Sequence, residues 1–232
     1  MSNLNKVIVA LDQMSLEEID LFLRRSENTL TFVKIGLELF LKHGPEIVLR
    51  IKRDHNKKIF LDLKLHDIPN TVGKAIHSLK GLPIDFLTLH LTGGEEMLKE
   101  AVIARNESIP GCKLLGVSFL TSLEAQDLES LFAITNSEAA FLRLFNLASR
   151  SGIDGVVSSP HEVVLLKNHY PKLLSVTPGI RFQDEINSTQ TQDQKRVMDP
   201  KEAFNVGADF LVMGRSLTKA HDLKNRIQIL MS

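Results

Sequence analysis

Eight short apolar runs, rich in strand-forming residues, recur along the chain, and the gaps between them carry helical patterns. The runs are nearly continuous rather than alternating with polar residues, which is typical of a parallel sheet covered on both faces by helices. Eight strands alternating with helices within 232 residues predict an α/β protein, a single-domain (β/α)8 TIM barrel over 1–232. An open doubly wound sheet stays an alternative, because strand number does not distinguish the two. The runs cover residues 7–12, 31–36, 58–65, 85–90, 113–120, 154–159, 173–179 and 208–216.

The gaps contain recognisable helix starts and stops. Ser15 and Glu18 form a capping-box pattern, which predicts that a helix begins there. Asp199 followed by a proline predicts another helix start, and the stretch 122–151 has room for two helices. The helix that starts after Asp199 is predicted to end at Gly207. Further helices are predicted from Pro45, over 71–80 with a stop at Gly81, over 94–108 and over 217–231.

The composition argues against two classes of partner. Hydrophobic residues make up 43% of the sequence, enough for a large core. Lys plus Arg number 28 and Asp plus Glu also 28, whereas a protein that coats nucleic acid or an anionic membrane needs excess positive charge. Cys112 is the only cysteine, which excludes an intrachain disulfide, and the first apolar run is too short for a signal peptide. We therefore expect a cytoplasmic protein without a nucleic-acid or membrane partner.

Ionisable residues follow or interrupt the first three apolar runs. In a barrel enzyme the carboxyl ends of the strands build the active site, and these residues stand at such ends. Burying such groups separately is very costly, but alternating carboxylates and ammonium groups neutralise one another. Any one pair is explained by a structural salt bridge, whereas the whole set favours function, since apolar residues serve stability better. The set comprises Asp12, Lys34, Asp62, Lys64 and, just beyond the third run, Asp67.

The spacing of Asp62 and Lys64 indicates a chemistry. Residues two apart on a strand share a face, so the two side chains are expected to point the same way. A lysine held between carboxylates stays cationic at neutral pH and can donate a proton to a developing carbanion. The aspartates would repel a substrate carboxylate, so the site suits a reaction that loses one.

Anion-binding features follow the seventh and eighth runs. Gly179 and Gly214 allow close approach to the backbone, and Arg181 and Arg215 supply charge and forked donors. The loops after strands seven and eight are the usual phosphate site of a (β/α)8 barrel. One Gly–Arg pair is explained by a simple turn, but two on consecutive strands favour a phosphate pocket. The long polar segment 181–196 is expected to act as a phosphate-gripping loop there.

Other candidates carry weaker signals. Thr121 follows the fifth run, where a ligand could reach it, and His90 ends the fourth, although a lone histidine there is more often structural. The spacing of the eight histidines matches no metal-ligand pattern. The sequence also contains no dinucleotide-binding Gly-x-Gly-x-x-Gly motif, no P-loop and no Gly-x-Ser-x-Gly nucleophile elbow.

The segment LDLKLHDIPNT at 61–71 resembles the signature of the orotidine 5′-phosphate decarboxylase family. Its Asp-x-Lys-x-x-Asp element also occurs in a wider barrel superfamily, but the full ordered set of matching residues is highly specific and spans essentially the whole chain. The matching residues are Asp12 in ALD, Lys34 in VKIG, Asp62, Lys64, Asp67 and Thr71 in the signature, Thr121 in LTS, Arg181 in TPGIR, Gln194 in DQKR, and Gly214 with Arg215 in GRS.

The resemblance implies an enzyme without metal or cofactor that converts orotidine 5′-monophosphate to UMP and CO₂, the last step of UMP biosynthesis. It also implies a homodimer with shared active sites, in which Asp67 and Thr71 of the partner subunit complete each site. Lys64 would protonate C6 of the pyrimidine, and Asp62 would lie beside the departing carboxylate. By the same resemblance, the charged network would consist of Lys34, Asp62, Lys64 and Asp67. The ribose would be contacted by Asp12, Lys34 and Thr71, the pyrimidine by Thr121, and the phosphate by Arg181, Gln194, Gly214 and Arg215.

Two rival functions are distinguished by single residues. A metal-dependent relative, such as a hexulose-phosphate synthase, would act on a sugar phosphate with Mg²⁺, but a cation at Lys34 would repel the metal. A non-catalytic nucleotide-binding protein on the same fold would be expected to lack Asp62 or Lys64, and both are present.

Overall fold

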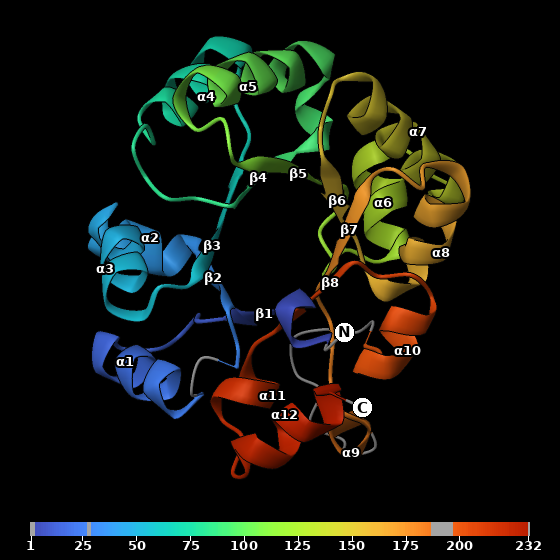
Figure 1. Cartoon of the computed structure of the whole chain (residues 1–232). Coiled ribbons are helices and arrows are strands. Elements are labelled where there is room, and N and C mark those ends of the chain that lie inside the picture. Colours follow the sequence, from blue (N-terminus) through green and yellow to red (C-terminus); the bar gives the residue numbers. More distant parts are fainter. Residues whose placement is uncertain (1–2, 27–28, 187–196, 232) are drawn as a thin grey trace.

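The computed structural model describes residues 3–26, 29–186 and 197–231 and has a closed barrel of eight parallel strands surrounded by helices (Figure 1). The strands follow one another around the barrel in chain order, and β8 pairs with β1 to close it. The predicted (β/α)8 fold is confirmed, and the open doubly wound sheet is excluded. The strands are β1 (Val7–Ala10), β2 (Phe32–Gly36), β3 (Lys58–Leu65), β4 (Phe86–His90), β5 (Lys113–Val117), β6 (Gly155–Val157), β7 (Leu174–Thr177) and β8 (Phe210–Met213).

Helices fill the connections and cover the outside of the barrel (Figure 1). Their apolar faces and the outward-facing strand residues form the larger part of the core. The α-helices are α1 (Leu16–Arg25), α2 (Leu37–His43), α3 (Glu46–His55), α4 (Pro69–His77), α5 (Glu95–Ser108), α6 (Ala125–Phe132), α7 (Ser137–Arg150), α8 (Pro160–His169), α9 (Gln183–Ile186), α10 (Pro200–Asn205), α11 (Arg215–Thr218) and α12 (Leu223–Met231), with 3₁₀ turns η1 (Asn3–Lys6) and η2 (Leu91–Gly93).

Most helix predictions are confirmed, including the capping box at Ser15 and two helices within 122–151. The prediction of one helix over 217–231 is wrong, because α11 ends at Thr218 and the Asp222 carboxylate caps a new helix by accepting the N–H of Asn225. Pro45 precedes α3 as its N-cap residue rather than occupying its first turn.

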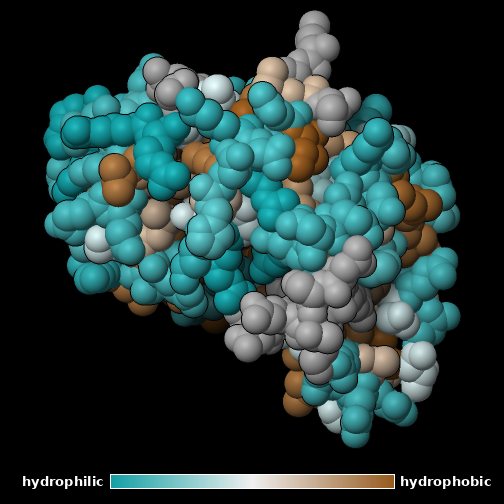
Figure 2. Space-filling view, turned by 90° about the horizontal axis from the view of Figure 1, so that it is seen from below, coloured by the Kyte–Doolittle hydropathy of each residue, from teal (hydrophilic) through white to brown (hydrophobic). Residues whose placement is uncertain are grey.

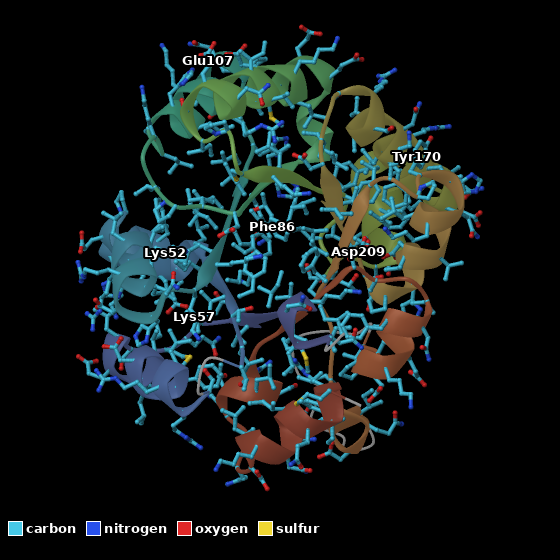
Figure 3. All side chains as sticks on the ribbon, in the orientation of Figure 1. Lys52, Lys57, Phe86, Glu107, Tyr170 and Asp209 are labelled. Carbon is cyan, nitrogen blue, oxygen red and sulfur yellow. The ribbon has the colours of Figure 1, made fainter. Side chains whose placement is uncertain are left out.

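Side chains inside the barrel form layers, because every second residue of a strand points inward. Phe32, Phe60, Phe86 and Phe210 lie in the inner apolar cluster, and the rings of Phe32 and Phe86 are 4.8 Å apart. Phe86 lies near the barrel centre in Figure 3. Interior positions two residues further along β2, β3 and β4 are polar. The aromatic layer is therefore a floor on which a polar layer rests, toward the carboxyl ends of the strands.

Three aspartates fasten the opposite, amino-terminal end of the barrel. Asp85, Asp154 and Asp209 each stand one residue before an even-numbered strand, and each carboxylate accepts a backbone N–H from the preceding odd-numbered strand. The acceptor–donor distance is 2.8 Å in all three cases. These three residues, here called the aspartate clips, tie β3 to β4, β5 to β6, and β7 to β8.

The outer surface is mostly hydrophilic in the view from below, with small hydrophobic areas between hydrophilic ones (Figure 2). In Figure 3 Glu107 points outward from α5. Within the described ranges no helix is both long and apolar enough to cross a membrane.

Candidate active site

A cavity of about 340 Å³ opens at the carboxyl ends of the strands and contains most of the predicted site residues. Its walls come from strands and from the segments that follow them, which are distant from one another in sequence. The polar residues that line it are Asp12, Gln13, Lys34, Asp62, Lys64, Thr121, Arg181 and Arg215, and the remaining lining residues are Ala10, Phe60, Val117, Phe119, Leu120, Val157, Pro178, Val212 and Gly214.

Carboxylates and ammonium groups alternate across one side of this cavity. Lys34 Nζ lies 2.8 Å from Asp12 Oδ2 and 3.3 Å from Asp62 Oδ2. Lys64 Nζ lies 2.8 Å from the same Asp62 oxygen. The order Asp12–Lys34–Asp62–Lys64, here called the charged row, places each inner group between two of opposite charge.

At the two inner groups of the charged row, Lys34 and Asp62, burial and the neighbouring charges shift the pKa in opposite directions. Burial lowers the pKa of Lys34, but attraction to the carboxylates of Asp62 and Asp12 outweighs it, so the pKa is raised above its ordinary value. Burial raises the pKa of Asp62, but attraction to Lys34 and Lys64, with hydrogen bonds from Lys64 and Thr88, holds the pKa below its ordinary value. Both side chains are therefore charged at neutral pH, although each residue is only 8% exposed.

The strand that carries Asp62 and Lys64 is irregular at this point. The register of β3 against β4 shifts between Leu61 and Leu65, and Lys64 has a φ of 51°, in the left-handed region. The backbone N–H of Lys64 donates to Thr88 Oγ1 at 2.9 Å. Asp62 and Lys64 thus meet, as predicted, but a local bulge and not plain strand alternation brings them together.

Arginines from two loops supply the other side of the cavity. Arg181 Nη1 lies 3.2 Å from the carbonyl oxygen of Ile180 and 3.4 Å from Ser216 Oγ. Ile180 pairs with Met198 in a β-bridge, and these two residues lie on either side of the polar segment 181–196 in the sequence. Arg215 is the first residue of α11, after Gly214. Positive charge at these two positions faces the same cavity as the charged row.

Two predicted residues do not line this cavity. Asp67 is exposed, and its Oδ1 accepts the N–H of Ile68 at 2.6 Å. Thr71 is exposed in the first turn of α4. Both lie on the loop and helix that follow β3, beside Ile68, whose side chain is also exposed. Gln194 lies outside the described residues, as does the whole segment 187–196.

His90 lies beside the site without lining the cavity. Its ring is 5.1 Å from that of His66. Burial lowers the pKa of His90, and the charges of His66 and Lys64 lower it further. The position of His90 outside the cavity lining favours its structural interpretation.

Sequence analysis missed two residues that shape the site. Thr88 is fully buried and its hydroxyl donates to Asp62 Oδ1 at 2.8 Å. Alternation from Phe86 along the predicted strand could have placed Thr88 on the inner face. Gln13 has a φ of 62° and its N–H donates to Glu38 Oε2 at 3.2 Å, which fixes the loop after Asp12. Left-handed backbone at glutamine has no sequence signal.

The described part of the chain contains no group of three or more His, Cys, Asp and Glu side chains placed to hold a metal ion. In the cavity itself, the two carboxylates of the charged row are each paired with an ammonium group. Lysine is not a ligand for a hard cation such as Mg²⁺, which takes oxygen donors.

Comparison with known proteins gives consistent results over nearly the whole chain. The family model described as orotidine 5′-phosphate decarboxylase / HUMPS matches residues 5–228. Orotidine 5′-phosphate decarboxylase of Staphylococcus saprophyticus is 44% identical over 220 residues, covering 94% of this chain and 93% of the relative. The enzyme of the same name from Opitutus terrae is 44% identical over 217 residues, covering 93% and 92%. The crystal structure of orotidine 5′-phosphate decarboxylase from Lactobacillus acidophilus superposes with a TM-score of 0.81 at 35% identity, covering 97% of both chains.

Proposed function

Because the chain belongs to the orotidine 5′-phosphate decarboxylase / HUMPS family, we propose that it converts orotidine 5′-monophosphate to UMP and CO₂, the last step of UMP biosynthesis. The observation that carries this proposal is the charged row facing Arg181 and Arg215 across one cavity. At one end of such a cavity, the carboxylates and ammonium groups of the charged row can receive a pyrimidine that carries a carboxylate. At the other end, the two arginines can bind a phosphate.

The charged row supports a stepwise account of the chemistry. Asp62 is held ionised, so a substrate carboxylate placed next to it meets a like charge, and breaking the C6–carboxylate bond removes that repulsion. The electron pair of the broken bond stays on C6 while CO₂ leaves. Lys64 Nζ, 2.8 Å from Asp62 and open to the cavity, then gives its proton to C6, and solvent restores that proton. Lys34 keeps Asp62 ionised and is the group we assign, with Asp12, to the ribose hydroxyls.

The phosphate end supplies binding energy far from the breaking bond. We assign Arg181, Arg215, the backbone at Gly214 and Gln194 to the phosphate, and Thr121 to the pyrimidine. Binding energy gathered by the phosphate contacts can be used to exclude water from the charged row.

We also propose a homodimer, in which Asp67 and Thr71 of the partner subunit complete each site. Its support is the solvent-exposed position of both residues, outside the cavity of their own chain. Ile68 between them is 66% exposed, a position that an interface would cover. A cytoplasmic location accords with a biosynthetic role, and we propose it on that ground alone.

Loss of orotidine monophosphate absorbance in the presence of EDTA tests the reaction. Wild type is expected to turn over without metal, while Lys64→Ala is expected to lose at least about 100-fold in kcat, the low end for a general acid. Lys172→Ala, at an exposed position before β7, is the matched control and is expected to behave as wild type. Sedimentation of the same proteins tests the dimer.

Other outcomes identify the rival functions. Activity only on a sugar phosphate with Mg²⁺ would assign the chain to the metal-dependent branch of the fold. Tight UMP binding without turnover would make it a nucleotide-binding protein.

A further inference from the structure

Thr88 lies on β4 opposite the irregular part of β3. Leu61 pairs with Leu87 and Leu65 with Leu89, so the three residues 62–64 on β3 face Thr88 alone on β4. A bulge of this kind leaves backbone groups without their ladder partners. The Thr88 side chain replaces the missing partner, because its oxygen accepts the N–H of Lys64 at 2.9 Å.

This contact determines which way the hydroxyl proton points. An amide N–H can only donate, so Thr88 Oγ1 is the acceptor in its bond with Lys64. Its single proton is then available for Asp62 Oδ1, 2.8 Å away. The other oxygen of Asp62 receives the ammonium groups of Lys64 and Lys34. The two carboxylate oxygens therefore have different partners, which fixes the rotation of the carboxylate about its Cβ–Cγ bond.

We propose that Thr88 is a positioning residue that sets the Asp62–Lys64 pair, by holding the bulged backbone of Lys64 and the carboxylate of Asp62 with one hydroxyl. The inference rests on the proposed function, in which these two residues act on the substrate. Thr88 itself is completely buried and does not line the cavity, so it acts through its neighbours rather than on the substrate.

The geometry separates two effects of losing the hydroxyl. Lys64 would keep its ammonium group, and the phosphate contacts would be untouched. The bulge would lose the acceptor that holds Lys64 at a φ of 51°, and Asp62 Oδ1 would lose its donor. Substrate binding through the phosphate should therefore persist while proton delivery becomes poorly aligned.

Steady-state decarboxylation by Thr88→Val, Thr88→Ser and Lys64→Ala tests the proposal, with thermal unfolding of each variant measured alongside. Thr88→Val is expected to lower kcat by about 10- to 100-fold, the range that hydrogen bonds to charged groups supply, with KM changed less than about threefold. Thr88→Ser keeps the hydroxyl and is expected to recover most of kcat. If the valine variant does not fold, Thr88→Ala lacks the same hydroxyl and carries the same expectation.

Thr177→Val is the matched control. Thr177 is a fully buried threonine of β7 whose hydroxyl makes no hydrogen bond to any described residue, so the same chemical change should leave kcat near that of wild type. Equal kcat in wild type and Thr88→Val, or a serine variant as slow as the valine one, would overturn the role of Thr88. A wild type that does not decarboxylate orotidine monophosphate would instead overturn the proposed function.

Discussion

Lys64 donates a 2.8 Å hydrogen bond to Asp62 from a residue whose own backbone is left-handed, with a φ of 51°. A non-glycine residue in this region costs about 1 kcal/mol or more, so the surrounding structure must hold it there. The same Asp62 oxygen lies 3.3 Å from Lys34. One carboxylate thus contacts two ammonium groups, and the backbone conformation that allows this is stabilised by the contacts around it.

Replacing the central carboxylate should disable the charged row. Asp62→Asn leaves Lys34 and Lys64 close together without the charge between them, and it removes the group that repels the substrate carboxylate. We expect kcat to fall by about 10²–10³-fold, the usual loss for a preorganised electrostatic group. Single-turnover decarboxylation measures this, and Asp62→Asn with wild-type kcat would contradict the assigned role.

The same variant makes a prediction about stability and pH. The pKa of Asp62 is lower in the folded chain than its ordinary value near 4. Its contribution to stability is therefore present above about pH 4 and is lost as the pH falls through the folded-state pKa. Urea unfolding should show Asp62→Asn less stable than wild type at pH 7, with the difference narrowing in acid. A difference that stays constant between pH 7 and the lowest pH at which both fold would contradict this.

The phosphate assignment predicts the behaviour of Arg215→Ala. This variant keeps Lys64 and Asp62 but lacks a forked cation at the phosphate end, so we expect kcat/KM to fall by about 100-fold. Calorimetric binding of UMP and of uridine is the internal control. UMP should bind more weakly to the variant, whereas uridine, which has no phosphate, should bind equally well to both proteins.

A substitution at Gly36 tests how tightly the side chains at the ribose end of the cavity are packed. A Cβ at this position would lie 2.2 Å from Asp12 Oδ1 and 3.1 Å from Lys34 Nζ, while the backbone conformation itself suits alanine. Gly36→Ala must therefore displace the Asp12 carboxylate, and we expect kcat/KM to fall by about tenfold or more. Gly111→Ala is the matched control, because a Cβ there meets nothing within 4 Å. Equal activity of both variants would mean that Asp12 relocates freely.

The aspartate clips predict a loss of stability without a loss of chemistry. Asp209 Oδ2 accepts the N–H of Ser175 at 2.8 Å and the ammonium of Lys167 at 2.5 Å (Figure 3 labels Asp209). Asp209→Ala leaves both donors without this acceptor and should lower the free energy of unfolding by about 2 kcal/mol. Glu96→Ala, at an exposed helix position, should change it by less than about 0.5 kcal/mol. The kcat of folded Asp209→Ala should match wild type, because the clip lies at the opposite end of the barrel.

Much of the architecture was predictable because buried segments can be recognised in the sequence by their apolar residues. Each of the eight apolar runs contains one strand of the barrel, since strands covered on both faces must be apolar throughout. Strand ends were less certain: the runs 113–120 and 208–216 extend beyond β5 and β8 into the loops that line the cavity. The loop residues Phe119 and Leu120 resemble strand residues in sequence because they are apolar, and both line the cavity.

The site was predictable where a residue's type alone indicates its role, and not where its role depends on its neighbours. Asp12, Lys34, Asp62 and Lys64 stand out as charges within apolar runs, and the structure brings all four together. Thr88 is an ordinary strand residue by sequence. Its importance follows from a shift in pairing between β3 and β4 that no local pattern encodes.

The aspartate clips stand at the far end of the barrel from the reacting atoms, yet they bear on where those atoms lie. A slip of one residue between paired strands moves a strand end by about 3.3 Å, whereas a catalytic group tolerates a misplacement of only about 0.5 Å. Each clip ties one residue before a strand to a specific amide of its neighbour, which makes any slipped pairing lose that bond. The clips therefore act on the choice of register during folding: they favour the native pairing over slipped ones, and a molecule that has reached the native pairing keeps its strand ends, and the groups these carry, in place.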